Sequence, residues 1–149
     1  MSKLMPRPNL PKVAVLIATA LTCVVALQAN GQLPATAKKE LAKEMIGTWA
    51  LAGTPDNIEK PADGARLKLL TGKHWAVTQY DPKTGKVIFH HGGTYTLDGD
   101  SYTEAVEYAN ENTAGLIGQK LKFKVKVDGD IFTNVGQGNP WTEAWKRAK

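Results

Sequence analysis

The side chains best suited to chemistry lie on two expected strands that flank the turn at Asp98-Gly99. A two-residue loop there would place Tyr95 across from Tyr102 and Gly93 across from Glu104. Because side chains alternate along a strand, one face of this hairpin gathers mostly apolar residues. Its members are Val87, Phe89, His91, Tyr95, Leu97, Tyr102, Glu104, Val106 and Tyr108. The sequence therefore predicts a carboxylate and tyrosine hydroxyls among apolar side chains.

A carboxylate in apolar surroundings needs an explanation. Burial costs free energy unless Glu104 is paired, hydrogen-bonded or kept protonated by a raised pKa. Two interpretations remain open: a structural polar network inside the protein, or a polar contact that orients a bound ligand. Under the second interpretation, the expected ligand contacts are His74, Tyr95, Tyr102, Glu104 and Phe123.

Alternation also predicts which side chains of three other strands face inward. In LKFKVKV the expected inward residues are Leu121, Phe123, Val125 and Val127, and the lysines between them face solvent. On the last strand one face would carry a second carboxylate, and it holds Trp141, Glu143, Trp145 and Arg147. The strand at 74–80 is ambiguous. A two-residue loop before it turns His74, Ala76, Thr78 and Tyr80 inward, whereas a three-residue loop turns Trp75, Val77 and Gln79 inward.

These residues require a scaffold of strands joined by tight turns. Residues 35–45 have the apolar spacing of one short amphipathic helix. The eight expected strands that follow are IGTWALA, RLKLL, HWAVTQY, VIFHHGGTYTL, SYTEAVEYA, LKFKVKV, IFTNVG and WTEAWKR. An eight-stranded meander removes its exposed edges by closing into a barrel. We therefore expect an all-β fold: an eight-stranded antiparallel up-and-down β-barrel at 46–149, preceded by a short helix and linker at 32–45.

The first 31 residues have the form of a secretory signal peptide. Lys3, Arg7 and Lys12 precede the uncharged run VAVLIATALTCVVAL, which is shorter than the roughly 20 residues that a membrane-spanning helix needs. Cleavage after Gly31 would leave a secreted or periplasmic protein with no stable membrane span. Two alternatives remain open: an uncleaved anchor, and a lipoprotein attached through Cys23.

Charge gives little reason to expect a nucleic-acid partner. The formal net charge of +5 includes the three bases of residues 1–31, so cleavage would lower it to +2. Cleavage would also remove the single cysteine, which excludes disulfide and thiol chemistry in the mature chain.

Several segments resemble a known group of proteins. GTW, GKHW, YDPKTGK, GGTYTLDGDSYTE, LIGQKLKFKVKVDGD and EAWKR are similar to a bacterial family of secreted lipocalin-like domains of largely uncharacterised function. The likeness covers nearly all of residues 44–149 and follows the calycin pattern of lipocalins and fatty-acid-binding proteins. It implies that Gly47, Trp49 and Arg147 close one end of the barrel, with the arginine stacked on the tryptophan. Unlike many lipocalins, the chain has no disulfide and is short, so we expect a small or largely filled cavity.

The function that we expect is binding of a small, mostly apolar or amphipathic molecule inside the barrel, without a cofactor. The first alternative is a small barrel enzyme in which Glu104, Tyr102 and His74 perform acid-base chemistry, although no known catalytic motif is present. Metal or haem binding through His74, His90 and His91 is disfavoured, because adjacent residues of a strand point to opposite faces. The last alternative is an envelope interaction module with a filled interior.

Overall fold

The structure is a computed structural model that describes residues 34–149. The expected signal peptide, its cleavage site and Cys23 lie outside the described residues. The elements in chain order are α1 (Ala35–Met45), β1 (Gly47–Thr54), β2 (Asn57–Ile58), β3 (Leu67–Leu70), β4 (His74–Tyr80), β5 (Val87–Asp98), β6 (Ser101–Ala109), the 3₁₀ helix η1 (Glu111–Leu116), β7 (Lys120–Asp128), β8 (Ile131–Gly136) and β9 (Thr142–Arg147).

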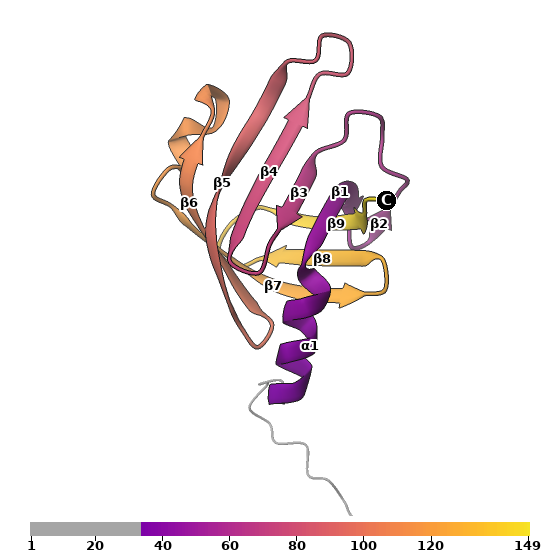
Figure 1. Cartoon of the computed structure of the whole chain (residues 1–149), viewed down its shortest axis with the longest axis vertical. Coiled ribbons are helices and arrows are strands. Elements are labelled where there is room, and N and C mark those ends of the chain that lie inside the picture. The colour runs from indigo at the N-terminus through magenta and orange to yellow at the C-terminus, as the bar shows by residue number, and fades with distance from the viewer. Residues whose placement is uncertain (1–33) are drawn as a thin grey trace, which may run out of the picture. The chain divides into compact units, whose positions relative to one another are not determined.

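The strands form a closed antiparallel barrel (Figure 1). From β3 to β9 each strand pairs with the next, and β1 pairs with both β3 and β9. The two-residue β2 pairs only with the end of β1. The β1–β9 ladder closes the ring and places Trp49 opposite Arg147. The predicted eight-stranded up-and-down barrel with a short N-terminal helix is therefore confirmed.

Helix α1 covers the end of the barrel at which β1 begins (Figure 1). Leu41 and Met45 of the helix are buried in the hydrophobic core. At the other end of the helix, Lys38 Nζ lies 2.6 Å from Asp98 Oδ1 in the β5–β6 hairpin. The long connections, including 110–119 with η1, lie at the opposite end, which we call the mouth.

The interior is filled mainly by aromatic side chains. The largest fully buried ones include Trp49, Trp75, Trp145, Tyr102 and Phe132. The alternation predicted for β7 is confirmed, because Leu121, Phe123 and Val125 are buried whereas Lys120, Lys122, Lys124 and Lys126 are exposed. Burying each large apolar side chain contributes on the order of 1.5–3 kcal/mol. These side chains therefore stabilise the barrel and also limit the space inside it.

The connection between β3 and β4 decides which face of β4 points inward. Residues 71–73 join the two strands, and Leu70 pairs with Trp75 across the turn. Both of these side chains are buried, as is Val77. His74 is exposed. The structure thus turns Trp75 and Val77 inward, as in the second alternative, and the expected position of His74 inside the barrel is corrected to the outer face.

The β5–β6 hairpin differs in register from the sequence expectation. Its turn residues are Gly99 and Asp100, so Tyr95 pairs with Glu104 and not with Tyr102. A shift of two residues keeps the same side chains on the inner face. Between Gly92 and Gly93, however, the register shifts by one residue, as in a β-bulge. Beyond it Tyr108 points outward and is exposed, contrary to the prediction that it shares the inner face.

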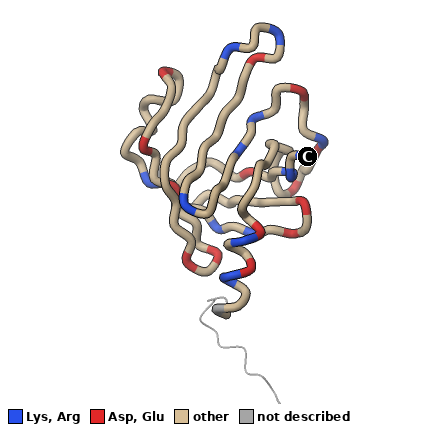
Figure 2. The backbone as a smooth tube through the Cα atoms, in the orientation of Figure 1, with Lys and Arg blue, Asp and Glu red and all other residues tan. Residues whose placement is uncertain are grey.

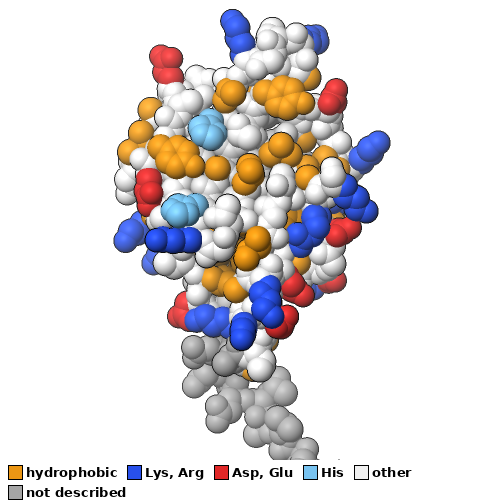
Figure 3. All heavy atoms as spheres, viewed as in Figure 1, with side chains coloured by type: hydrophobic (Ala, Val, Ile, Leu, Met, Phe, Trp, Pro, Cys, Tyr) orange, Lys and Arg blue, Asp and Glu red, His pale blue; other side chains and the backbone are white. Residues whose placement is uncertain are grey.

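The outer face over β3 to β6 shows hydrophobic side chains interspersed with polar ones (Figure 3). The exposed members on these strands include Leu69, Tyr80, Ile88 and Tyr108. Singly scattered apolar side chains are ordinary on protein surfaces. The residues that can do chemistry are instead inside the barrel.

Candidate functional site

A buried ion pair lies at the centre of the barrel. Lys68 Nζ is 2.8 Å from Glu104 Oε1, and both side chains are almost fully buried. Tyr102 donates its hydroxyl hydrogen to the same oxygen at 3.0 Å. Burial raises the pKa of Glu104, whereas the charge of Lys68 and the hydrogen bonds from Lys68 and Tyr102 oppose that rise. Glu104 is thus part of a polar network, and it also lines the pocket described below.

Aromatic rings surround the ammonium group of Lys68. Its Nζ lies 5.1 Å from the ring centroid of Trp145 and 5.6 Å from that of Phe123. Three more ring centroids lie at 5.9 Å, those of Trp75, Tyr102 and Phe132. The ring faces attract the cation and shield it from water. Lys68 is therefore held in place by one carboxylate and an aromatic enclosure.

Lys68 and Arg66 were not predicted from the sequence to lie inside the barrel. β4 carries no charged residue, and β5 carries one, Asp98 at its end (Figure 2). The interior cations are Lys68 of β3 and Arg66, the residue before β3. Lysine usually faces solvent, and RLKLL alone does not show otherwise. The available signal was the inward Glu104, which needs a cation as its partner. Lys68 can be that partner because it pairs with the inward Trp49 across the β1–β3 ladder.

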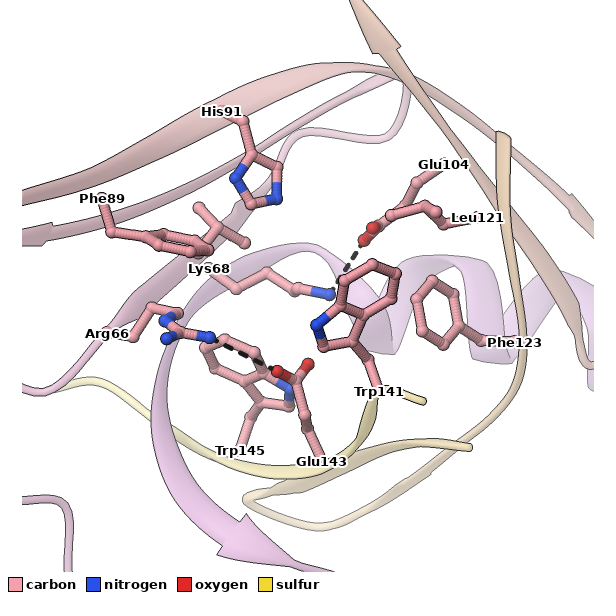
Figure 4. A pocket seen from close by; sticks show the side chains of 11 residues that line it. Arg66, Lys68, Phe89, His91, Glu104, Leu121, Phe123, Trp141, Glu143 and Trp145 are labelled. Carbon is pink, nitrogen blue, oxygen red and sulfur yellow. Dashed lines mark hydrogen bonds and ion pairs between the residues drawn. The ribbon is translucent and has the colours of Figure 1, made fainter. Parts of the chain in front are cut away.

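A small pocket lies above this ion pair, toward the mouth (Figure 4). We call it the mouth pocket. Its volume is about 30 Å³, and its lining is Arg66, Lys68, Val77, Phe89, His91, Glu104, Leu121, Phe123, Trp141, Glu143 and Trp145. A space of this size holds about two water molecules or one small polar group. Large buried side chains fill much of the interior among the described residues, as the short chain led us to expect.

The polar wall of the mouth pocket contains a second pair of opposite charges. Arg66 Nη1 lies 3.7 Å from Glu143 Oε1, and Arg66 Cζ lies 4.0 Å from the ring centroid of Phe89. Glu143 Oε2 accepts a hydrogen bond from Asn134 Nδ2 at 3.2 Å, and Asn134 Oδ1 accepts one from Trp145 Nε1 at 2.7 Å. Glu143 and Arg66 are thus each held by a second contact.

Two residues that line the pocket each have a buried nitrogen without a partner. Within the described residues, His91 Nδ1 and Arg66 Nε are buried and make no hydrogen bond. Burial lowers the pKa of His91 to about 4, and the positive charges of Lys68, Arg66 and His90 add to this effect. His91 is therefore neutral at pH 7. Its ring meets Phe89 and Trp75 edge-on, with centroids 4.8 and 5.3 Å away.

The structure brings together only some of the expected ligand contacts. Glu104 and Phe123 line the mouth pocket. Tyr102 is fully buried as a hydrogen-bond donor to Glu104, and the half-buried Tyr95 packs against it with ring centroids 5.1 Å apart. His74 lies on the outer face, so the group of Glu104, Tyr102 and His74 considered for acid-base chemistry is not assembled. Arg66, His91 and Glu143, which were not among the expected ligand contacts, also line the mouth pocket.

The closed end of the barrel contains the residues implied by the resemblance. Arg147 Cζ lies 4.0 Å from a ring centroid of Trp49. Its guanidinium donates to the carbonyl oxygens of Ile46 at 3.1 Å and Glu44 at 2.8 Å, while Trp49 Nε1 donates to that of Met45 at 2.8 Å. A Cβ at residue 47 would lie 2.8 Å from Arg147 Nη1, and the φ of 141° there also favours glycine.

Neither a metal site nor a membrane-spanning helix is present in the part of the chain that the structure describes. No three His, Cys, Asp or Glu side chains among residues 34–149 are grouped as metal ligands would be. No helix in this range combines the length and the apolar composition needed to cross a bilayer. His90 packs outside against Tyr108, and His91 points inside.

Comparison with known proteins identifies the fold. No family model matches the sequence, and no curated protein is significantly similar to it. Among solved structures, the chain is similar to a lipocalin-like protein from Bacteroides uniformis ATCC 8492, with a TM-score of 0.52 and 16% sequence identity. The match covers 70% of this chain and 99% of that protein. Together with the closed antiparallel ring of strands, this similarity shows that the chain has a lipocalin-like fold.

Proposed function

We propose that the barrel binds a small amphipathic molecule at its mouth, with the polar group of that molecule in the mouth pocket. The observation that carries this proposal is the pair of buried nitrogens, His91 Nδ1 and Arg66 Nε, which belong to residues lining the same pocket and lack partners among the described residues. Buried polar groups are nearly always hydrogen-bonded, and leaving one unpaired is costly. A ligand that pairs with both nitrogens would therefore gain affinity.

The size of the pocket restricts how such a molecule binds. About 30 Å³ admits one polar group, and Lys68 with its aromatic enclosure fills the space beneath. The apolar part of the ligand would lie at the rim against Phe89 and Trp141, which line the pocket from β5 and from the residue before β9. The lipocalin-like fold supports small-molecule binding in general. The proposal thus places a mostly apolar ligand partly outside the barrel.

Native mass spectrometry of the protein purified from its own host tests the proposal. We expect a bound small molecule in the native protein, and an increase in melting temperature with amphipathic members of a lipophile panel. Trp141→Ala should remove both effects, whereas the control Val135→Ala, at an exposed position of β8, should keep them. An empty protein that no compound stabilises would contradict the proposal.

We also propose that the protein acts outside the cytoplasm, in the periplasm or the medium. The support is the sequence of residues 1–31, with its basic start and short apolar run. Mass spectrometry of the intact native protein should find an N-terminus at Gln32 in the periplasmic or extracellular fraction. A chain that retains residues 1–31 in the cytosolic fraction would contradict secretion.

A further inference from the structure

The mouth pocket is balanced in charge, and this balance bears on which polar group it accepts. Four side chains with formal charges line it: Arg66, Lys68, Glu104 and Glu143. Each cation lies beside a carboxylate, at 3.7 Å for Arg66 and Glu143 and at 2.8 Å for Lys68 and Glu104. The formal charges of these four side chains sum to zero, whether the proton of the buried Lys68–Glu104 pair lies on Lys68 or on Glu104. His91 adds no charge at pH 7, because its pKa is about 4.

A charged ligand would need one of these pairs to open. Glu143 is fixed by Asn134, whose own side chain is fixed by Trp145 Nε1. Arg66 is fixed over the ring of Phe89. A carboxylate that took Arg66 would leave Glu143 without its cation, and an ammonium group that took Glu143 would leave Arg66 without its anion. Either ion would lose hydration without meeting a net opposite charge.

The two unpartnered nitrogens require hydrogen bonds and not a counter-ion. Arg66 Nε can only donate, so the ligand must offer an acceptor. His91 Nδ1 donates or accepts, depending on which ring nitrogen carries the hydrogen. A primary carboxamide offers both an acceptor, its carbonyl oxygen, and a donor, its N–H group, without adding charge.

We infer that the mouth pocket selects an uncharged hydrogen-bonding head group, such as a primary carboxamide, over a carboxylate or an ammonium group of similar size. This inference rests on the proposed function and specifies its ligand class. It follows from the zero charge sum, the two fixed ion pairs and the two unpartnered nitrogens of one pocket.

Four probes that share a phenyl ring test this selection: benzamide, benzoate, benzylammonium and toluene. Their dissociation constants are measured at pH 7 by NMR titration of the purified protein. We expect benzamide to bind at least about tenfold more tightly than the other three, because only benzamide brings both a donor and an acceptor without adding charge. Benzoate or benzylammonium binding as tightly as benzamide would overturn the inference and leave the proposed function standing. Failure of all four probes to bind would overturn both.

Charge variants of the pocket sharpen the test. Glu143→Gln keeps the shape of the side chain and gives the pocket one net positive charge, so the preference should move about tenfold toward benzoate. Arg66→Gln should move it toward benzylammonium. Glu107→Gln on the outer surface, where Glu107 accepts a hydrogen bond from Thr94, is the matched control and should change nothing. If both pocket variants melt cooperatively and keep the order of the four probes, charge balance does not set the selection and the inference fails.

Discussion

The two ends of the barrel use the same stacking contact for different purposes. Arg147 lies over Trp49 at the closed end, and Arg66 lies over Phe89 toward the mouth, each with Cζ 4.0 Å from a ring centroid. Arg147 also donates to two backbone carbonyls, whereas Arg66 has an ion pair of 3.7 Å with Glu143 and an unpartnered Nε. The same stacking contact therefore belongs to a fully hydrogen-bonded arginine at the closed end and to an incompletely hydrogen-bonded one toward the mouth.

The ion pair of Lys68 and Glu104 lies between these two regions and belongs to both. It forms the floor of the mouth pocket and also contacts the aromatic core that continues to the closed end. Variants at the two ends and at this floor can therefore separate stability from binding. The contrast predicts that changes at the closed end affect mainly the free energy of unfolding, and that changes at the mouth affect mainly ligand affinity.

The largest expected effect is the loss of the closed-end tryptophan. Trp49→Ala removes a fully buried ring together with its stack on Arg147 and its bond to Met45, and should lower the free energy of unfolding by about 3–5 kcal/mol. Trp141→Ala at the half-buried rim should cost about 1 kcal/mol. Urea denaturation followed by fluorescence measures both. Equal losses would show that the two ends do not differ in this way.

Removing one member of the floor pair should cost nearly as much. Lys68→Met leaves Glu104 buried without its cation, for which we expect a loss of about 3–5 kcal/mol in the free energy of unfolding. The double variant Lys68→Met with Glu104→Leu leaves no buried charge and should recover most of this loss. Denaturant titrations of the two variants and the wild type provide the comparison. A double variant no more stable than the single one would contradict the assignment of the loss to an unpaired charge.

His91 should make stability depend on pH between its folded and unfolded pKa values. Its folded pKa of about 4 lies below the ordinary value of 6.5, so the unfolded chain binds a proton first as the pH falls. The stability contribution is complete above about pH 6.5 and is lost between there and pH 4, with a total of about 3 kcal/mol. His91→Gln should flatten this part of the unfolding profile, measured as urea midpoints from pH 7 to pH 4. The exposed His74→Gln is the control and should keep the wild-type slope.

The sequence predicts the barrel well because its strands alternate clearly and its turns contain glycine. For β7, four lysines on one face left only one way to orient the strand. The orientation of β4 depended on one residue of loop length, and Tyr108 was placed wrongly because a register shift between Gly92 and Gly93 changes its face. A single-residue insertion is not visible in alternation.

The site was harder to predict than the fold, because it depends on contacts between distant strands. Strand alternation predicts Glu104 as an inward carboxylate, but its partner Lys68 lies 36 positions earlier in the chain, on another strand. Arg66 and His91 both line the mouth pocket and each has a buried nitrogen without a partner, which alternation does not predict. A strand pattern shows which side a residue faces, and not whether its polar atoms are satisfied there.

The smallest expected effects come from exchanging each stacked arginine for lysine. Arg147→Lys loses the forked pair of bonds to Ile46 and Glu44, so it should lower the free energy of unfolding by about 1–2 kcal/mol and leave benzamide affinity unchanged. Arg66→Lys should change stability by less than about 0.5 kcal/mol, because its ion pair is long and partly exposed. It should nevertheless weaken benzamide binding, since the Nε donor is gone. Urea midpoints and NMR titrations on the two variants measure both quantities. The two ends differ in kind only if Arg147→Lys changes stability without changing benzamide affinity, and Arg66→Lys changes benzamide affinity without changing stability.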